Sequence, residues 1–343
     1  MKLSFEEAAK QLATTRGGYT LWLGAGAAMA VTSGASPSWQ SLVTELETAN
    51  GINPSSTDYP RRLEAISQRM GHAAFRRDLK KRLFDAVISN PFDPEVALSL
   101  GVIGSRAASI VSFNIEPITS LPAALMRSNQ YTWRTFRERS PFAVGPSFDT
   151  DPGPAIAPIY FPHGLLLEGN LVMTESEYDR HKGSLAVTTA VHYAVGGDLV
   201  IIGMSLADHY LRAAILASRR WIRNVYWFGS DFEFREWARV AEVACVHVAH
   251  DRLWGGLREA FVEADYKKAY EARITNARDY VVESWRAINS WDAQVRNHIK
   301  TSILTFLVTP EFTNEQVTAL AEYCHDAGYE VPDTLLSDPR CMI

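Results

Sequence analysis

Residue types that bind ligands and move protons follow the ends of four apolar runs in this chain. Glycine allows a ligand to approach the backbone closely, asparagine and serine donate and accept hydrogen bonds, and histidine or a carboxylate accepts protons. In chain order, the four groups are Gly24-Ala25-Gly26, Asn114-Ile115-Glu116, His163-Gly164, and Gly203-Met204-Ser205 followed by Asp208. Because short apolar runs are typical of buried parallel strands, we expect all four groups at the ligand-binding, carboxyl edge of an α/β sheet.

The turn Gly24-Ala25-Gly26 is compatible with two roles. A strand, a Gly-x-Gly turn and a helix in succession bring backbone N–H groups to one point, which attracts phosphate without a charged side chain. The dinucleotide fingerprint, however, has a third glycine where this chain has Met29, and Thr32-Ser33-Gly34 interrupts the helix, so that it is expected to be short. A standard Rossmann dehydrogenase is therefore disfavoured. From this turn alone, a nucleotide site and a structural bend remain equally open.

Each of the other three groups also has a structural explanation. Asn114 could cap a turn or helix, His163 could be a half-buried histidine with its hydrogen bonds satisfied, and Ser205 with Asp208 could begin a helix. Packing alone is a poor explanation for four strand ends that all carry such residues. The set as a whole therefore favours a binding or catalytic site.

The elements that must position these groups alternate between apolar runs and helical patterns, which indicates an α/β fold. We expect a Rossmann-like, doubly wound parallel sheet of about six strands. The six runs span residues 20–23, 109–113, 156–161, 199–203, 225–229 and 245–249. A helix is predicted from near Pro37 to Gly51, and residues 61–87 read as one longer amphipathic segment with Arg and Lys on its outer face.

The chain is predicted to divide into an α/β domain at residues 1–263 and a helical extension at residues 264–343. Residues 139–158 are crowded with Pro, Gly, Ser and Asp and are expected to form a loop within the first unit. After about residue 264 the strand–helix alternation stops, and helical patterns follow. The apolar faces of these helices fit packing within the chain, homo-oligomerisation or binding of a partner protein.

Composition restricts the class of protein. With 343 residues, 47% of them apolar and 21% charged, the chain is long enough for one large globular domain and a smaller one. A net charge of −5 and the lack of a basic block give no indication of nucleic-acid binding. No signal peptide and no stretch of membrane-spanning length is evident. The three cysteines are far apart and fit neither a disulfide framework nor a CxxC zinc site, so we expect a cytoplasmic protein with free thiols.

Taken together and in this order, the segments resemble the sirtuin superfamily over about residues 21–249. Family members carry Gly-Ala-Gly, a small-residue stretch ending in proline, an Asn-x-Asp strand end, His-Gly and Gly-x-Ser-Leu. The run 170–178 (NLVMTESEY) and Pro37-Ser38-Trp39 look like the zinc-less prokaryotic branch. The chain departs from the deacylases because residues 164–203 contain no cysteine for their zinc module, because Phe113 replaces a glutamine, and because Glu116 replaces an aspartate. These departures argue against an acyl-lysine peptide as substrate.

The resemblance implies a site that binds and cleaves NAD without zinc. Asn114 and His163 are the implied catalytic residues: Asn114 would hold the nicotinamide ribose or the attacking water, and His163 would act as the general base. The implied NAD-binding residues are Gly24, Ala25 and Gly26 at the pyrophosphate, Ser205 and Asp208 near the adenosine ribose, Glu116 facing the carboxamide, and Gly203.

The activity that this resemblance implies is NAD hydrolysis to nicotinamide and ADP-ribose. Zinc-less members of the branch deplete NAD in bacterial anti-phage defence, so a homo-oligomer and a partner such as a HerA-type hexameric ATPase or another phage sensor are expected, with no membrane association. Two alternatives stay open: a deacylase or ADP-ribosyltransferase of the same fold, and a module that senses NAD or ADP-ribose without turnover. Keeping both Asn114 and His163 favours catalysis.

Overall fold

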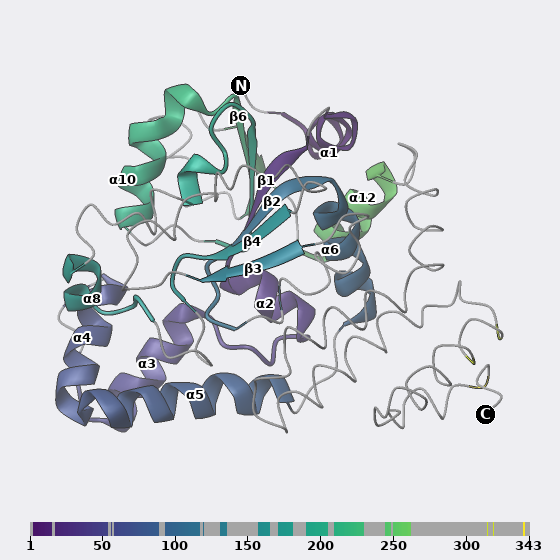
Figure 1. Cartoon of the computed structure of the whole chain (residues 1–343). Coiled ribbons are helices and arrows are strands. Elements are labelled where there is room, and N and C mark those ends of the chain that lie inside the picture. The colour runs from purple at the N-terminus through teal and green to yellow at the C-terminus, as the bar shows by residue number, and fades with distance from the viewer. Residues whose placement is uncertain are drawn as a thin grey trace.

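Figure 1 shows the computed structural model of the chain, in which helices surround one parallel sheet. The chain is therefore an α/β protein, as predicted. The structure describes residues 3–15, 18–53, 56, 58–88, 93–116, 119, 131–135, 157–164, 171–180, 190–204, 209–229, 244–247, 250–261, 314, 318 and 339.

The sheet of the described residues contains seven strands, and each neighbouring pair is parallel. In spatial order the strands are β3-β4-β2-β1-β5-β6-β7. Their bounds are β1 Tyr19–Leu23, β2 Ala107–Ser112, β3 Tyr131–Thr135, β4 Ala157–Phe161, β5 Asp198–Ile202, β6 Asn224–Gly229 and β7 Ala244–His247.

Among the described residues, helices precede β1, follow β7 and occur in the connections β1–β2, β4–β5 and β5–β6. Their bounds are α1 Phe5–Thr14, α2 Ala25–Val31, α3 Trp39–Ala49, α4 Tyr59–Met70, α5 His72–Ile88, α6 Pro94–Arg106, α8 Glu175–Arg180, α10 His209–Ser218, the 3₁₀ turn η1 Arg219–Trp221, and α12 His250–Phe261. Several begin at a recognisable cap: the Ser4 hydroxyl accepts from the Glu7 N–H while the Glu7 carboxylate accepts from the Ser4 N–H, which completes a capping box for α1.

The order of the strands locates the edge at which sheets of this type bind ligands. β1 lies at the centre, with β2 on one side and β5 on the other. With the edge strand β3 set aside, this order is compatible with a Rossmann-like sheet, in which the direction of winding reverses between β1 and β5. Leu23 at the end of β1 is paired with Ile202 at the end of β5. The next residues, Gly24 and Gly203, therefore meet at this switch point.

Both faces of the sheet are buried under helices, which explains why its strands are continuous apolar runs. Along β1, Leu21 and Leu23 belong to a core cluster that includes side chains of α1 to α6 and α12, whereas Trp22 belongs to a second cluster that includes α10. Figure 1 shows α10 on one side of the sheet and α1, α6 and α12 on the other. These two layers hold the strand ends in fixed relative positions.

The observed elements confirm part of the prediction and correct the rest. Each of the six predicted runs overlaps an observed strand, but the sheet gains a seventh strand, β3, at residues 131–135 that no apolar run indicated. The helix predicted after Pro37 is confirmed as α3. The single amphipathic segment predicted at 61–87 is instead two helices, because Gly71 takes a φ of 82° and ends α4 before α5 begins.

Two further predictions concern the length of α2 and the end of the chain. Helix α2 ends at Val31, before Thr32, and is short, as expected; its first residues, Ala25 and Gly26, belong to the glycine turn. The predicted loop lies outside the described residues, apart from 157 and 158, and so does the extension at 264–343, apart from the isolated residues 314, 318 and 339. The division of the chain at residue 263 stays a prediction.

None of the helices that the structure describes is long and apolar enough to cross a membrane.

Candidate active site

The glycine turn after β1 packs directly against the end of β5. The N–H of Gly24 donates to the carbonyl of Ile202 at 3.0 Å, and the N–H of Gly26 donates to the carbonyl of Gly203 at 2.8 Å. A Cβ atom on Gly26 would lie 2.8 Å from the Gly203 Cα, which is too close for any side chain. Gly203 itself takes a φ of 71°, a conformation that favours glycine. Contact between two backbones therefore explains Gly26 and Gly203.

This packing bears on the phosphate-binding role predicted for the turn. Two of the three expected donors, the amides of Gly24 and Gly26, already donate to main-chain carbonyls. Both N–H groups would have to exchange these acceptors before they bound a pyrophosphate. The structural bend thus has direct support from the geometry, whereas the pyrophosphate role of Gly24, Ala25 and Gly26 stays a prediction.

Asn114 lies just beyond the end of β2, beside this turn. Its side chain is 4% exposed, and its Nδ2 donates to the carbonyl of Gly24 at 3.1 Å. This bond fixes which end of the amide is the donor, so Oδ1 lies on the opposite side as an acceptor. The structure thus joins two of the predicted site residues, Asn114 and Gly24, at neighbouring strand ends.

Glu116 follows two residues later and is also buried, with 3% of its surface exposed. Its carboxylate accepts hydrogen bonds from the Thr119 hydroxyl at 2.6 Å and from the Thr119 N–H at 3.2 Å. Glu116 therefore holds the turn that follows β2, which is a structural role. Its predicted contact with a carboxamide stays a prediction.

His163 lies at the end of β4, the strand next to β2, and is 8% exposed. Its Nδ1 lies 3.0 Å from the Val172 carbonyl, and the Val172 N–H donates to the His163 carbonyl at 3.1 Å. A carbonyl oxygen can only accept, so Nδ1 carries the proton in the neutral ring and Nε2 carries the lone pair. This tautomer is the one that a general base acting through Nε2 requires.

Aromatic rings line the His163 imidazole. The centroid of Phe113 is 5.5 Å from that of His163, and Phe113 in turn packs on Trp22 of β1 at 4.9 Å, both edge to face. On another side, Tyr178 of α8 lies with its ring centroid 5.8 Å away and its hydroxyl 3.1 Å from Nδ1 and 3.4 Å from Nε2. These rings keep water away from most of the imidazole.

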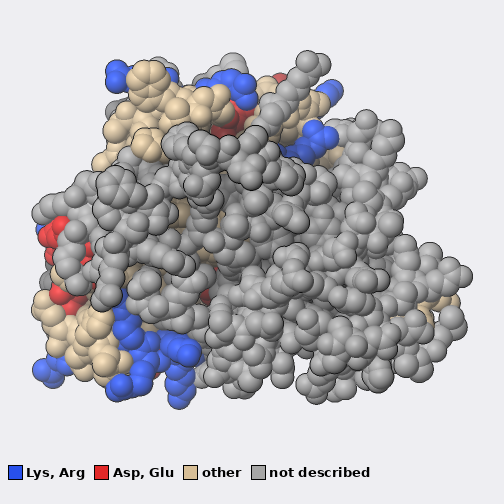
Figure 2. All heavy atoms as spheres, viewed as in Figure 1, with Lys and Arg blue, Asp and Glu red and all other residues tan. Residues whose placement is uncertain are grey.

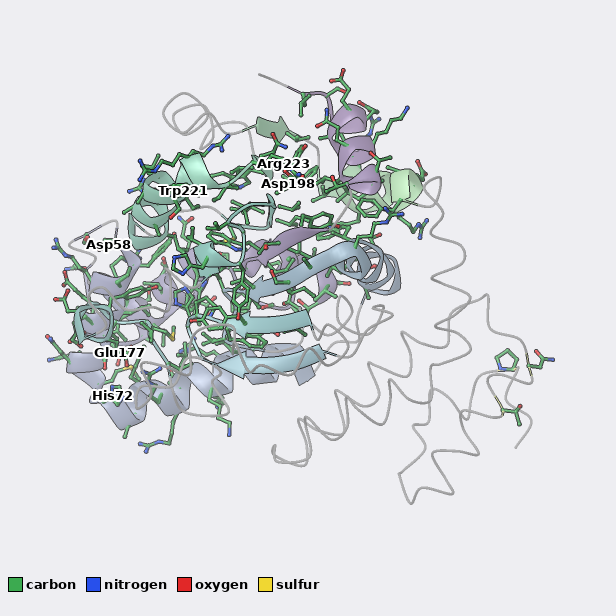
Figure 3. All side chains as sticks on the ribbon, turned by 45° about the horizontal axis from the view of Figure 1, so that its top comes forward. Asp58, His72, Glu177, Asp198, Trp221 and Arg223 are labelled. Carbon is green, nitrogen blue, oxygen red and sulfur yellow. The ribbon has the colours of Figure 1, made fainter. Side chains whose placement is uncertain are left out.

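The segment that supplies Val172 and Tyr178 is anchored by a buried ion pair. Glu177 of α8 pairs with Arg76 of α5, and its second carboxylate oxygen accepts from the N–H groups of Met173 and Thr174 at 2.8 and 2.9 Å. Figure 3 labels Glu177 where α8 approaches α4 and α5, at a distance from Asp198 at the start of β5.

A second anchor joins α8 to α4. The carboxylate of Glu64 accepts from the Ser176 hydroxyl at 2.7 Å and from the Ser176 N–H at 3.1 Å. Burial alone would raise the pKa of Glu64, but these hydrogen bonds, with one from Gln68, outweigh it and hold that pKa below its usual value. Glu64 is therefore ionised at neutral pH and fixes the first turn of α8.

Among the described residues, hydrogen bonds join four of the predicted site residues in two pairs, and Phe113 links His163 to the neighbouring strand end. Asn114 bonds to Gly24, Gly26 bonds to Gly203, and His163 contacts Phe113 next to Asn114. Ser205 and Asp208 lie outside the described residues. Within the described part of the chain, no group of three or more His, Cys, Asp or Glu side chains is arranged to hold a metal ion.

Sequence patterns assigned no role to Tyr178 or Glu177, although both lie near His163 or hold the segment that covers it. The available signal was Thr174-x-x-Glu177, the spacing at which a glutamate reaches back to the first N–H of a helix. That pattern predicts a helix start but does not reveal what the helix packs against.

In comparisons with known proteins, no protein-family model matched the chain, and no curated protein matched it.

Proposed function

We propose that this chain hydrolyses NAD at the bond between nicotinamide and ribose. The observation that carries the proposal is the state of His163: the ring is nearly buried at a strand end, and its Nδ1 is committed to the Val172 carbonyl. Asn114, at the end of the neighbouring strand, is held by the Gly24 carbonyl. A base of fixed tautomer and a polar amide at adjacent strand ends suit the activation of one water molecule.

The proposed reaction needs no metal and no redox step. Nicotinamide leaves as a neutral pyridine and takes the electrons of the C–N bond, while a water oxygen forms a bond to C1′ of the ribose. His163 Nε2 takes one proton of that water and later releases it to solvent. Asn114 Oδ1 accepts a hydrogen bond from the water or from a ribose hydroxyl and so orients it. The products are nicotinamide, ADP-ribose and one proton.

The proposal can be tested by incubating the purified chain with NAD and separating the products by chromatography. We expect nicotinamide and ADP-ribose in equal amounts from the wild type. His163→Ala and Asn114→Ala should each lower the rate by at least about 100-fold, which is the usual contribution of a positioned general base. The matched controls are His192→Ala, at an exposed histidine, and Asn50→Ala, whose Nδ2 also donates to a main-chain carbonyl. Both controls should keep the wild-type rate.

Binding measured by calorimetry separates the alternatives. Saturable NAD binding without turnover would replace the hydrolase by the sensing module. Neither binding nor turnover would mean that the glycine turn is only a bend and would remove both. Transfer of ADP-ribose or removal of an acyl group from a protein, without free ADP-ribose, would favour the transferase or deacylase instead.

The resemblance to the zinc-less sirtuin-like branch also supplies a biological setting for the proposal. An NAD hydrolase of this kind acts as an NAD-depleting effector in bacterial anti-phage defence, held inactive until infection. Residues 264–343 would then mediate homo-oligomerisation or contact with a HerA-type hexameric ATPase or another phage sensor. Light scattering on the full chain, alone and with such a partner, tests this role, and a monomer that binds no partner would contradict it.

A further inference from the structure

Each polar contact of His163 for which the structure gives a distance is made with the segment 171–178. The Val172 carbonyl accepts from Nδ1, the Val172 N–H donates to the His163 carbonyl, and the Tyr178 hydroxyl lies within 3.4 Å of both ring nitrogens. All three contacts come from a stretch of chain that begins shortly after the histidine and lies outside the sheet. The state of the ring therefore depends on where this segment lies.

The Val172 carbonyl and the Tyr178 hydroxyl both favour a proton on Nδ1. The carbonyl can only accept, so it takes the Nδ1 proton at 3.0 Å. The Tyr178 hydroxyl lies nearer Nδ1, at 3.1 Å, than Nε2, at 3.4 Å, and its oxygen can accept from the same N–H.

The segment has little regular structure of its own, and two carboxylates hold it, Glu64 at Ser176 and Glu177 at the residues around Val172. Only its last part, from Glu175 onward, belongs to the short helix α8, and Glu177 there binds Arg76 through one oxygen and the Met173 and Thr174 N–H groups through the other. Arg76 reaches further and donates to the Leu171 carbonyl at 3.4 Å. The Arg76–Glu177 pair thus contacts the segment on both sides of Val172.

Arg76 differs from the exposed cations of its helix. Arg77, Lys80 and Lys81 are exposed on α5, and basic side chains gather at the surface over this helix in Figure 2. The Arg76 side chain is 17% exposed and turns inward to Glu177, which is 5% exposed. Burying both charges is costly, and a well-packed apolar pair would hold two helices as well or better. What gives this pair a role beyond helix packing is the second Glu177 oxygen, which accepts from the Met173 and Thr174 N–H groups.

We infer that Glu177 and Arg76 are positioning residues for His163, and that they hold the 171–178 segment so that Val172 and Tyr178 fix the Nδ1–H tautomer. The role in turnover rests on the proposed hydrolysis of NAD, whereas the tautomer itself is a property of the substrate-free protein. Because Nε2–H is the tautomer that a histidine in water prefers, release of the segment lets His163 return to a mixture of the two forms.

The tautomer can be measured without any activity, by nitrogen NMR of the full chain labelled with ¹⁵N only at its nine histidines. The signals missing from His163→Ala identify His163. In the wild type we expect a protonated Nδ1 and an unprotonated Nε2. In Glu177→Gln, and to a smaller extent in Tyr178→Phe, we expect the two signals to move toward each other as the tautomers exchange.

Two matched controls remove similar groups elsewhere in the core. Glu47→Gln breaks the buried Arg62–Glu47 pair, and Tyr226→Phe removes a hydroxyl that donates to Gln11 at 2.8 Å. Both controls should leave the His163 signals at their wild-type positions. If Glu177→Gln fails to fold, as judged by its circular dichroism, Arg76→Lys and Tyr178→Phe take its place.

Kinetics then separate positioning from binding. We expect Glu177→Gln to lower kcat about tenfold or more and to change KM less than about twofold, because a misplaced base affects the chemical step and not NAD binding. An unchanged His163 tautomer in both Glu177→Gln and Tyr178→Phe would overturn the inference, whether or not the wild type hydrolyses NAD. An altered tautomer in a chain without NAD turnover would uphold the positioning role and contradict the proposed function alone.

Discussion

Two buried arginine–glutamate pairs lie in the same half of the molecule and hold different kinds of structure. Arg62 of α4 binds Glu47 of α3 through two parallel hydrogen bonds of 2.8 and 2.6 Å, with side chains 11% and 3% exposed. Arg76 of α5 binds Glu177 of α8 through one carboxylate oxygen, while the other oxygen accepts two main-chain N–H groups.

The difference lies in what the carboxylate does with its second oxygen. Both oxygens of Glu47 accept from one guanidinium, and the hydrogen bond to Glu47 raises the pKa of Arg62 above its already high value. That pair connects two regular helices. Glu177 divides its oxygens between an arginine and the main chain and so holds an irregular segment in place. The same kind of ion pair thus forms a helix clamp at Arg62–Glu47, where it joins two helices, and supports the candidate site at Arg76–Glu177.

The largest expected effect follows from removing the carboxylate of Glu177, whose two oxygens bind different partners. Glu177→Ala leaves Arg76 without its ion pair and two buried N–H groups without an acceptor, so we expect a loss of about 3–5 kcal/mol in the free energy of unfolding. Urea unfolding followed by circular dichroism measures it. A smaller loss than that of Glu47→Ala would contradict the view that Glu177 supports more than one partner.

Removing the helix clamp should cost somewhat less. Glu47→Ala leaves Arg62 half-buried and unpaired but disturbs no main-chain bond of the site, so a loss of about 3 kcal/mol is expected. The same urea titration gives the value, and NAD turnover at saturating substrate supplies the second readout. If turnover falls as far as in Glu177→Gln, the two pairs are not distinct in function.

The contact between Gly26 and Gly203 extends the comparison to main-chain packing at the switch point. Gly26→Ala places a methyl group against the Gly203 backbone, so we expect a loss of about 1–3 kcal/mol in the free energy of unfolding. Gly255→Ala is the matched control, since its added Cβ would meet no atom outside its own helix within 4 Å and α12 is helical there. That control should stabilise the chain by about 0.5–1 kcal/mol.

The smallest effect concerns the second anchor of α8, between Glu64 and Ser176. The pKa of Glu64 is lower in the folded chain, so its contribution is complete above the unfolded-state value of about 4.3 and is lost as the pH falls through the folded value below it. We expect Glu64→Gln to flatten the stability profile below pH about 4 by less than about 1 kcal/mol. Thermal melts between about pH 3 and pH 7 test this expectation, because that range brackets the reference pKa of glutamate. A profile identical to that of the wild type would show that this contact adds nothing.

Local patterns in the sequence predicted the elements that depend on neighbouring residues. Continuous apolar runs located six strands, because a strand buried on both faces has no polar side to alternate with. The polar residues after β2 and β4 were placed at strand ends for the same reason. The pattern at 61–87 did not show the break at Gly71, because the apolar spacing of α5 continues that of α4 closely enough to hide one residue of different conformation.

By itself, the sequence determined that Gly24, Asn114, His163 and Gly203 come at the ends of strands in one parallel sheet. Only the tertiary structure decided what each of them touches. Arg76 and Glu177 are 101 residues apart, and Asn114 and Gly24 are 90 apart, so no local periodicity connects them. Which tautomer His163 adopts depends on a carbonyl and a hydroxyl that an ion pair holds over it. Such contacts depend on how separate layers pack, and this is a property of the whole fold.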